Sequence, residues 1–261
     1  MSASFKGRTA LVTGASSGLG VALARELARR GADLVLVARS QAPMQALAQE
    51  LRAGGRQVRV WPCDLTDAGA REALVAGLAA EGLAIDVLVN NAGLGVFGHF
   101  AEADWQRLDG MLAVDIVALT HLTRLLLPGM RARGWGRVLQ VASTAAFQPT
   151  PHYAAYAAAK GYVLSFGYAL DAELRGSGVR CTVLSPGVTA TGFFAVSGQS
   201  PTWYQRLTRM SAATVARQGV AAMQRGRGGV VAGWFNALMA QGTRLMPRRL
   251  ATAVAGRLMR N

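Results

Sequence analysis

Apolar runs alternate with amphipathic stretches along most of the chain. Short apolar runs predict buried strands, and longer stretches with apolar residues three or four apart predict helices. The expected strands are residues 9–13, 33–38, 57–62, 85–90, 136–143 and 179–185. The expected helices are residues 18–30, 44–53, 70–81 and 153–175, with one long or two shorter helices in 105–133.

This regular alternation of strands and helices predicts an α/β fold. Strands joined through a helix run parallel with a right-handed crossover, so we expect a Rossmann-like, doubly wound parallel sheet in three α/β/α layers. A length of 261 residues suits a single domain, 1–261. Ligands bind such sheets at the carboxyl ends of the strands, so the informative residues should directly follow strands.

Composition narrows the class of protein. Hydrophobic residues make up 51% of the chain and charged residues 16%, which is typical of a globular protein. Cys63 and Cys181 lie in apolar, strand-like contexts and are expected to be buried free thiols. We find no secretory signal and no uninterrupted apolar run of about 18 residues. These features predict a cytoplasmic protein.

Positive charge is concentrated in the last third of the chain. Residues 174–261 contain twelve arginines and no acidic residue, and so supply 12 of the 14 net positive charges. These arginines are Arg175, Arg180, Arg206, Arg209, Arg217, Arg225, Arg227, Arg244, Arg248, Arg249, Arg257 and Arg260. Such a surface should attract a phosphorylated cofactor, an acidic carrier protein, anionic lipid or nucleic acid.

A glycine-rich motif, TGASSGLG at 13–20, follows the first strand and opens the first helix. Glycines allow a tight turn and a close approach of the backbone to a ligand. The N-terminus of the helix then offers N–H groups to a pyrophosphate. An ordinary glycine-rich turn is the alternative. The residues expected to contact a dinucleotide here are Gly14, Ser16, Ser17, Gly18, Leu19 and Gly20.

The residue after the second strand indicates which dinucleotide binds. An acid there would bind the ribose hydroxyl of NAD, whereas a basic residue would accept the extra phosphate of NADP. Here the residue that follows the strand is Arg39, which favours NADP(H), although a plain surface charge is the alternative. Asp64 and Leu65 follow the third strand, where Asp64 can reach the adenine edge.

The sequence YAAAK, 156–160, carries Lys160, one of only two lysines among many arginines. A helix places Tyr156 and Lys160 on one face. A nearby ammonium should lower the tyrosine pKa from its ordinary value of about 10 toward neutrality, as general acid/base catalysis requires. Ser143, at the end of the fifth strand, could polarise a carbonyl oxygen.

Together these motifs resemble the short-chain dehydrogenase/reductase family. The resemblance covers roughly residues 5–195 and rests on TGASSGLG, NNAG at 90–93, Ser143, YAAAK and PGVTAT at 186–191. It implies hydride transfer between nicotinamide and a carbonyl or alcohol carbon, with Tyr156 as general acid/base and Lys160 on the nicotinamide ribose. It also implies cofactor contacts from Asn91, Ala92, Gly93, Pro186, Gly187 and Thr189.

One position departs from the family pattern. The family usually has an asparagine in the helix after NNAG, where it holds a water in a proton relay to the lysine, but this chain has Asp115. We expect Asp115 to take that place in the relay. Its carboxylate could pair with Lys160 and weaken the field on Tyr156. Impaired catalysis is the alternative.

Beyond the core, 1–187, the chain offers weaker signals. We expect a substrate lid in 188–230, where Phe193, Phe194, Trp203 and Tyr204 line an apolar pocket or simply pack as a short helix. Ser143 and Tyr156 would contact the substrate's carbonyl, and no metal-ligand cluster is present. Residues 95–97, 145–147 and 152–153 should form the other walls.

The basic extension, 231–261, resembles those of a bacterial branch associated with long acyl or lipid-like ketones. It mixes apolar residues with arginines, and Pro247 should separate two helices. The extension could cover the core, join subunits or contact an anionic membrane peripherally.

The leading functional interpretation is an NADP(H)-dependent reductase of a hydrophobic ketone or a 3-oxoacyl group, which a carrier could deliver. The alternatives are an alcohol or hydroxysteroid-type dehydrogenase working in oxidation, and a non-catalytic dinucleotide-binding protein that docks on anionic partners. We expect no nucleic-acid partner, because the chain has no recognised nucleic-acid-binding motif. The resemblance implies a homodimer or homotetramer.

Overall fold

Seven parallel strands form the main sheet in the part of the chain that the computed structural model describes, residues 5–200 and 202–259. Pro201 and Arg260 lie outside the described residues, as does the side chain of Arg244. The strand order is β3-β2-β1-β4-β5-β6-β9. The strands are β1 Thr9–Thr13, β2 Asp33–Ala38, β3 Val58–Pro62, β4 Val87–Asn90, β5 Gly136–Val141, β6 Val179–Ser185 and β9 Gly229–Val231.

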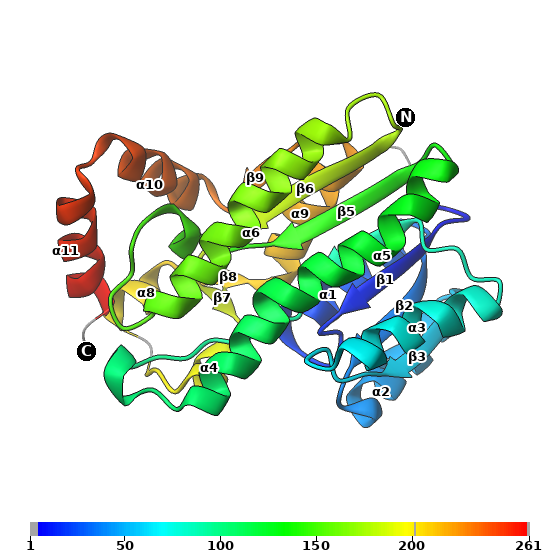
Figure 1. The fold of residues 1–261 in the computed structure, drawn as a ribbon, viewed down its shortest axis with the longest axis horizontal. Helices are drawn as coiled ribbons and strands as arrows, with labels where there is room; N and C mark the ends of the chain where they lie inside the picture. The colour runs from blue at the N-terminus through cyan, green and yellow to red at the C-terminus, as the bar shows by residue number, and fades with distance from the viewer. Residues whose placement is uncertain (1–4, 201, 260–261) are drawn as a thin grey trace.

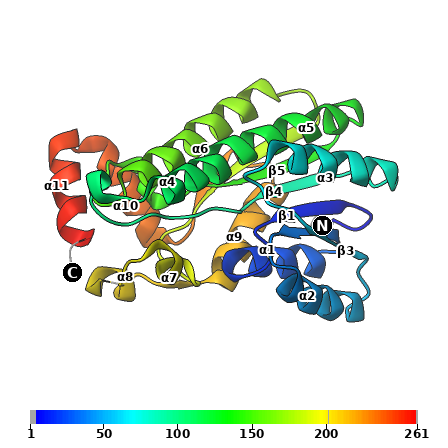
Figure 2. The same ribbon diagram turned by 60° about the horizontal axis from the view of Figure 1, so that its bottom comes forward.

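Helices cover both faces of this sheet and complete three layers (Figures 1 and 2). One face carries α1 Gly18–Arg29, α2 Gln41–Ala53 and α9 Ala212–Gln224. The other carries α3 Ala68–Ala80, α5 Leu119–Ala132 and α6 Ala154–Glu173. The predicted Rossmann-like α/β fold is confirmed.

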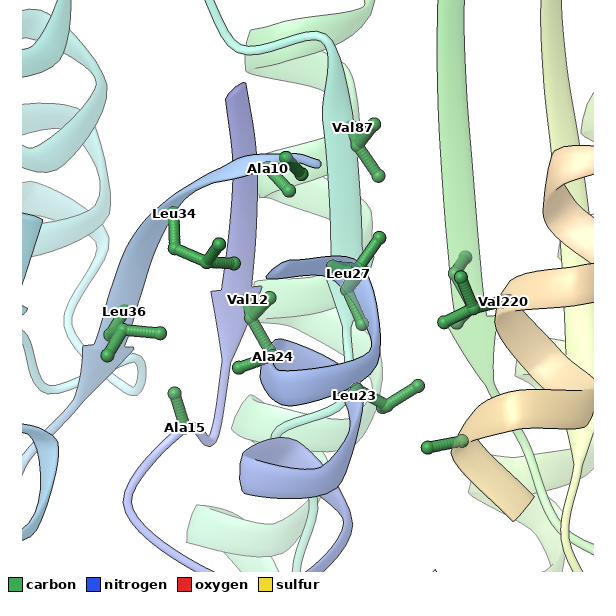
Figure 3. Close-up of a cluster of buried hydrophobic side chains, with 14 of the residues drawn as sticks. Ala10, Val12, Ala15, Leu23, Ala24, Leu27, Leu34, Leu36, Val87 and Val220 are labelled. Atoms are coloured by element: carbon green, nitrogen blue, oxygen red, sulfur yellow. The ribbon is translucent and has the colours of Figure 1, made fainter. Parts of the chain in front are cut away.

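The strands are buried on both faces, as a covered parallel sheet requires. In β1, Ala10 and Val12 pack into the cluster with α1, whereas Leu11 between them packs into the cluster on the opposite face. Figure 3 shows side chains of β1, β2 and α1 gathered against one another, with Val220 of α9 facing them. These central strands therefore appear in the sequence as continuous apolar runs rather than as alternating patterns.

The helical region predicted at 105–133 contains an irregularity. It consists of α4 Trp105–Leu112, a π-helical segment η2 Ala113–Ala118, and α5. The wider turns of a π-helix are rare and are frequent at functional sites, and η2 carries the fully buried Asp115. The predicted strand 136–143 ends earlier, at Val141, so Ser143 instead caps the short 3-10 helix η3 Thr144–Phe147.

Two elements within the predicted lid region, 188–230, belong to the core. Helix α9 packs on α1, and β9 pairs with β6 at the edge of the sheet. What remains above the cleft is a small unit: β7 Thr189–Ala190, α7 Phe193–Ser197, α8 Trp203–Leu207 and β8 Met210–Ser211. The sequence analysis did not predict α9 or β9, because β9 is only three residues long and its neighbours are rich in glycine and arginine.

The C-terminal extension forms two helices, α10 Trp234–Leu245 and α11 Arg248–Met259, which Pro247 separates as predicted. Both project from the same end of the molecule (Figure 1).

Cys63 and Cys181 are buried free thiols, also as predicted.

Within the described ranges, the stretch Trp105–Ala132 is long and apolar enough to cross a membrane. The stretch comprises α4, η2 and α5, and α5 packs on the sheet. Because core helices of soluble proteins pass the same test, this is weak evidence of a membrane span.

Candidate active site

A cleft of about 1140 Å³ lies where the strands end at their carboxyl termini. It brings together residues that follow six different strands, which the parallel topology places along one edge of the sheet. Every residue predicted to contact the cofactor or to act in catalysis, except Asp115, lines it, as do Phe193 and Phe194 of the predicted substrate pocket. These residues are Gly14, Ser16, Ser17, Gly18, Leu19, Gly20, Arg39, Asp64, Leu65, Asn91, Ala92, Gly93, Ser143, Tyr156, Lys160, Pro186, Gly187, Thr189, Phe193 and Phe194.

The glycine-rich loop is packed closely, as its glycines predicted. Gly14 has a φ of 66°, and a Cβ there would lie 2.8 Å from Asn91 Nδ2. A Cβ on Gly20 would collide with the Gly14 carbonyl oxygen. The Ser17 side chain makes no capping hydrogen bond to α1, and the first turn has no acidic residue. The loop and the helix N-terminus therefore fit a pyrophosphate, with backbone N–H groups directed toward it.

Thr13 holds this loop against the loop after β4, a role that the sequence analysis missed. Its Oγ1 accepts hydrogen bonds from the backbone N–H groups of Asn91 and Ala92, each at 3.0 Å. The Asn91 side chain in turn donates to the Thr13 carbonyl at 2.9 Å. A threonine that ends an apolar strand just before a glycine was the available signal.

Arg39 and Asp64 lie exposed at the adenosine end of the cleft. The Thr66 backbone N–H donates to Asp64 Oδ1 at 3.0 Å, and this bond lowers the pKa of the Asp64 carboxyl, with a smaller contribution from the charge of Arg39. Arg39 lines the cleft, and none of the ion pairs found among the described residues includes it. This arrangement fits a phosphorylated ribose.

Tyr156, Lys160 and Asp115 form a cluster beneath the middle of the cleft. Lys160 Nζ lies 3.0 Å from Asp115 Oδ2 and donates to the Val141 carbonyl at 3.3 Å. It lies 5.7 Å from the centre of the Tyr156 ring. The Leu94 N–H donates to Asp115 Oδ1 at 2.8 Å. Asp115 therefore forms a buried ion pair with Lys160, the pairing that the sequence analysis gave as a possibility beside a role in the relay.

Gly93 packs against this ion pair and, like Lys160, lines the cleft. A Cβ at that position would lie 3.1 Å from Lys160 Nζ and 3.2 Å from Asp115 Oδ1. A larger residue here would therefore crowd both members of the pair. Sequence reasoning had placed Gly93 only as a cofactor contact.

The pKa of Tyr156 is raised above its ordinary value, whereas the nearby lysine had led us to expect a lowered pKa. Burial raises the pKa of the Tyr156 hydroxyl; Lys160 and a hydrogen bond with Ser143 oppose this effect, and Asp115 adds to it. Burial alone would lower the pKa of the Lys160 ammonium, but Asp115 and Tyr156 together raise it. Burial raises the pKa of Asp115, against the effect of Lys160. The lysine therefore stays charged, and the tyrosine stays protonated at neutral pH.

The far end of the cleft is apolar and is built largely from the C-terminal helices. Phe193, Phe194 and Tyr204 line it as predicted, whereas Trp203 points into solvent and does not. The structure adds residues of α10, α11 and the link between them that no motif identified: Leu238, Met239, Thr243, Met246, Val254 and Leu258. Their side chains extend the apolar lining of the cleft onto the C-terminal extension.

Other predicted walls are present only in part. Gly95, Val96, Ala145 and Tyr153 line the cleft, whereas Phe97, Phe147 and His152 do not. The Tyr153 hydroxyl lies 3.0 Å from both Ser197 Oγ and Gln199 Oε1, and so ties α6 to the lid.

Among the described residues, no three His, Cys, Asp or Glu side chains gather as metal ligands.

Replacement of Asp115 by Asn should move the pH profile of the reaction to lower pH. Asp115 raises the pKa of Tyr156, so removing its negative charge lowers that pKa. Ketone reduction, which needs protonated Tyr156, should then decline at a lower pH, and alcohol oxidation, which needs the phenolate, should begin at a lower pH. Rates measured in both directions across pH test this; an unchanged profile would show that the carboxylate does not act on Tyr156.

Comparison with known proteins agrees with this geometry. Residues 8–201 match the family model described as short chain dehydrogenase. The ketoacyl reductase HetN of Nostoc sp. is 37% identical over 187 residues, which are 71% of this chain and 65% of that protein. A very-long-chain 3-oxoacyl-CoA reductase of Anas platyrhynchos is 35% identical over 202 residues, 74% of this chain and 64% of that protein. The chain thus spans less than two thirds of the length of each of these two relatives.

Solved structures show the same fold with either dinucleotide. A short-chain dehydrogenase of Sphingobium yanoikuyae in complex with NADPH has a TM-score of 0.80 and 29% identity, covering 92% of this chain and 95% of that one. A short chain dehydrogenase/reductase of Burkholderia phymatum in complex with NAD has a TM-score of 0.82 and 26% identity, covering 92% and 93%. The chain therefore belongs to the short-chain dehydrogenase family, oxidoreductases that bind a nicotinamide dinucleotide and act on CH–OH groups.

Proposed function

We propose that the protein uses NADPH to reduce a hydrophobic ketone or a 3-oxoacyl group to the corresponding alcohol. The observation that supports this most is the continuity of the cleft. One cavity joins the glycine-rich loop, the hydroxyls of Ser143 and Tyr156, and an apolar chamber walled by α7, α8, α10 and α11. A small polar substrate would leave most of this apolar wall unused.

Each side chain of the site has its own role in the proposed reduction. A bound nicotinamide supplies the hydride. Ser143 and Tyr156 donate hydrogen bonds to the substrate's carbonyl oxygen, and Tyr156 gives its proton to that oxygen as charge develops there. Lys160 stabilises the phenolate left behind, and its contact with Asp115 holds the ammonium beside the tyrosine. Because burial keeps Tyr156 protonated, the site favours reduction near neutral pH.

The names of the two relatives support the substrate class. Both are named for the reduction of ketoacyl or 3-oxoacyl groups, one of them with very long chains. The apolar residues of α10 and α11 offer a surface on which an acyl chain could lie.

A series of 3-oxoacyl thioesters or methyl ketones of increasing chain length tests the proposed substrate. Each buried methylene contributes about 0.8 kcal/mol, so kcat/KM should rise about fourfold per added carbon until the chamber is full. The measurement is NADPH consumption with wild type. Met246→Ala, which shortens a side chain that lines the chamber from the C-terminal extension, should reduce the slope with chain length while preserving the rate on the shortest substrate. A flat series would exclude a long apolar substrate.

Replacement of Arg39 by Ser should weaken NADPH selectively. Loss of a charge-assisted contact with the ribose phosphate costs about 1.5–3 kcal/mol, so KM for NADPH should rise roughly 10- to 100-fold. KM for NADH should change little, because NADH lacks that phosphate. Arg131→Ser on α5 removes an exposed arginine elsewhere and serves as the matched control. Equal effects on both cofactors would assign Arg39 no role in choosing between them.

A further inference from the structure

The outer face of α10 is largely apolar, the reverse of an ordinary surface helix. Trp234, Leu238 and Leu245 lie on one stripe and are exposed by 80%, 62% and 91%, and the exposed Gln241 is the one polar side chain described on that stripe. Phe235 and Met239 are exposed beside them, whereas the polar Asn236 is buried. A helix on a globular protein normally turns its polar side to water. This face therefore has the composition of a contact surface.

Two neighbouring helices extend this surface. On α8, Trp203 is exposed by 68% and Leu207 by 78%, and on α11 Leu250 and Val254 are exposed. Figures 1 and 2 both show α8, α10 and α11 at one end of the molecule. Gln205 Nε2 lies 3.5 Å from Met259 Sδ, which joins α8 to α11. We call the exposed apolar side chains of these three helices the terminal surface.

Exposed arginines lie on α8 and α11 or directly after α8. They are Arg206, Arg209, Arg248, Arg249 and Arg257. No acidic residue occurs anywhere in residues 174–261 to offset them. The combination of exposed tryptophan and leucine with unopposed arginine is typical of helices that lie in the interface of an anionic bilayer.

We propose that the terminal surface docks on an anionic lipid membrane. A second copy of the chain fits less well, because a symmetric dimer through this face would bring arginines opposite arginines with no acid between them. A bilayer offers negative headgroups to the arginines and an acyl region to the tryptophans and leucines. This interaction goes beyond the proposed function and does not depend on the identity of the substrate.

Docking in this orientation would place the substrate entrance against the membrane. Leu238 and Met239 are exposed on the terminal surface and also line the cleft. An apolar substrate could therefore move from the bilayer into the cleft without crossing water.

Co-sedimentation of the full-length protein with vesicles tests the proposal. We expect binding to phosphatidylcholine vesicles that contain phosphatidylglycerol, weakening as salt is added, and little binding to phosphatidylcholine alone. Replacement of Trp234 and Leu245 by Ser should lower the affinity at least tenfold. Neither residue lines the cleft, so the rate on a short soluble ketone should be unchanged.

A charge-matched pair of triple variants separates local docking from overall charge. Arg248, Arg249 and Arg257 changed to Gln should lower vesicle affinity about a hundredfold, at roughly fivefold for each arginine near the surface. Arg124, Arg131 and Arg175 changed to Gln remove the same charge from α5 and the segment after α6 and should change it far less. Equal losses in the two variants, or no wild-type binding, would overturn the proposal. So would dissociation of a vesicle-free oligomer by the Trp234/Leu245 changes, which would identify a second copy as the occupant.

Discussion

Tyr156→Phe is expected to lower kcat for ketone reduction roughly 10²- to 10⁴-fold, the usual contribution of a positioned general acid. The phenylalanine ring fills the same space and lacks only the hydroxyl that gives its proton to the substrate oxygen. NADPH affinity and the free energy of unfolding should stay near their wild-type values. The measurement is steady-state NADPH consumption together with NADPH titration by fluorescence.

Tyr162→Phe provides the matched control for this prediction. Tyr162 lies on the same helix, its hydroxyl lies 2.9 Å from Thr120 Oγ1, and it does not line the cleft. Its loss should leave the rate within a factor of two or so, since one exposed hydrogen bond contributes only about 1 kcal/mol to stability. A Tyr156→Phe enzyme that retained most of its activity would require another proton donor.

Lys160→Met is expected to be the most damaging single change to the fold of the site. Methionine has a similar length but no charge, so Asp115 would remain fully buried without its counter-ion. Breaking a buried ion pair in this way costs about 3–5 kcal/mol. Activity should fall as well, because the phenolate of Tyr156 would lose the charge of Lys160, the larger of the two effects that favour it.

The double variant Lys160→Met, Asp115→Asn separates these two effects. Removing the orphaned carboxylate should restore much of the free energy of unfolding, measured in urea, while the activity stays low. The single variant should also become relatively more stable as pH falls. A buried Asp115 whose pKa lies above its unfolded value binds a proton more readily in the folded state, so protonation favours folding. A double variant as unstable as the single one would show that Lys160 stabilises the fold by some route other than Asp115.

Sequence patterns predicted the sheet and the cofactor loop well, because each depends on local rules. Buried parallel strands require apolar runs, and the turn after β1 requires Gly14 at a positive φ. The i, i+4 spacing of Tyr156 and Lys160 places them on one helix face without tertiary information. For these residues, chain order and topology determine position.

The rest depended on contacts between distant segments. The pairing of Asp115 with Lys160 joins η2 to α6, and Gly93 from a third segment packs closely against both side chains. The raised pKa of Tyr156 depends on its burial, which spacing alone does not reveal. The role of α10 and α11 as a cleft wall was also hidden, since their amphipathic pattern fits either packing or surface attachment. Such features require knowledge of the folded chain.

Transfer of deuterium from NADPH that carries deuterium in both C4 positions of the nicotinamide tests directly whether the protein is a reductase that transfers hydride. We would incubate wild type and Tyr156→Phe with the deuterated cofactor and a long-chain 3-oxoacyl thioester, and examine the product by mass spectrometry. We expect one deuterium on the carbinol carbon with wild type and almost none with the variant. Tight binding of NADPH by wild type with no deuterium in any product, across the chain-length series, would rule out the proposed reduction and favour a non-catalytic dinucleotide-binding protein.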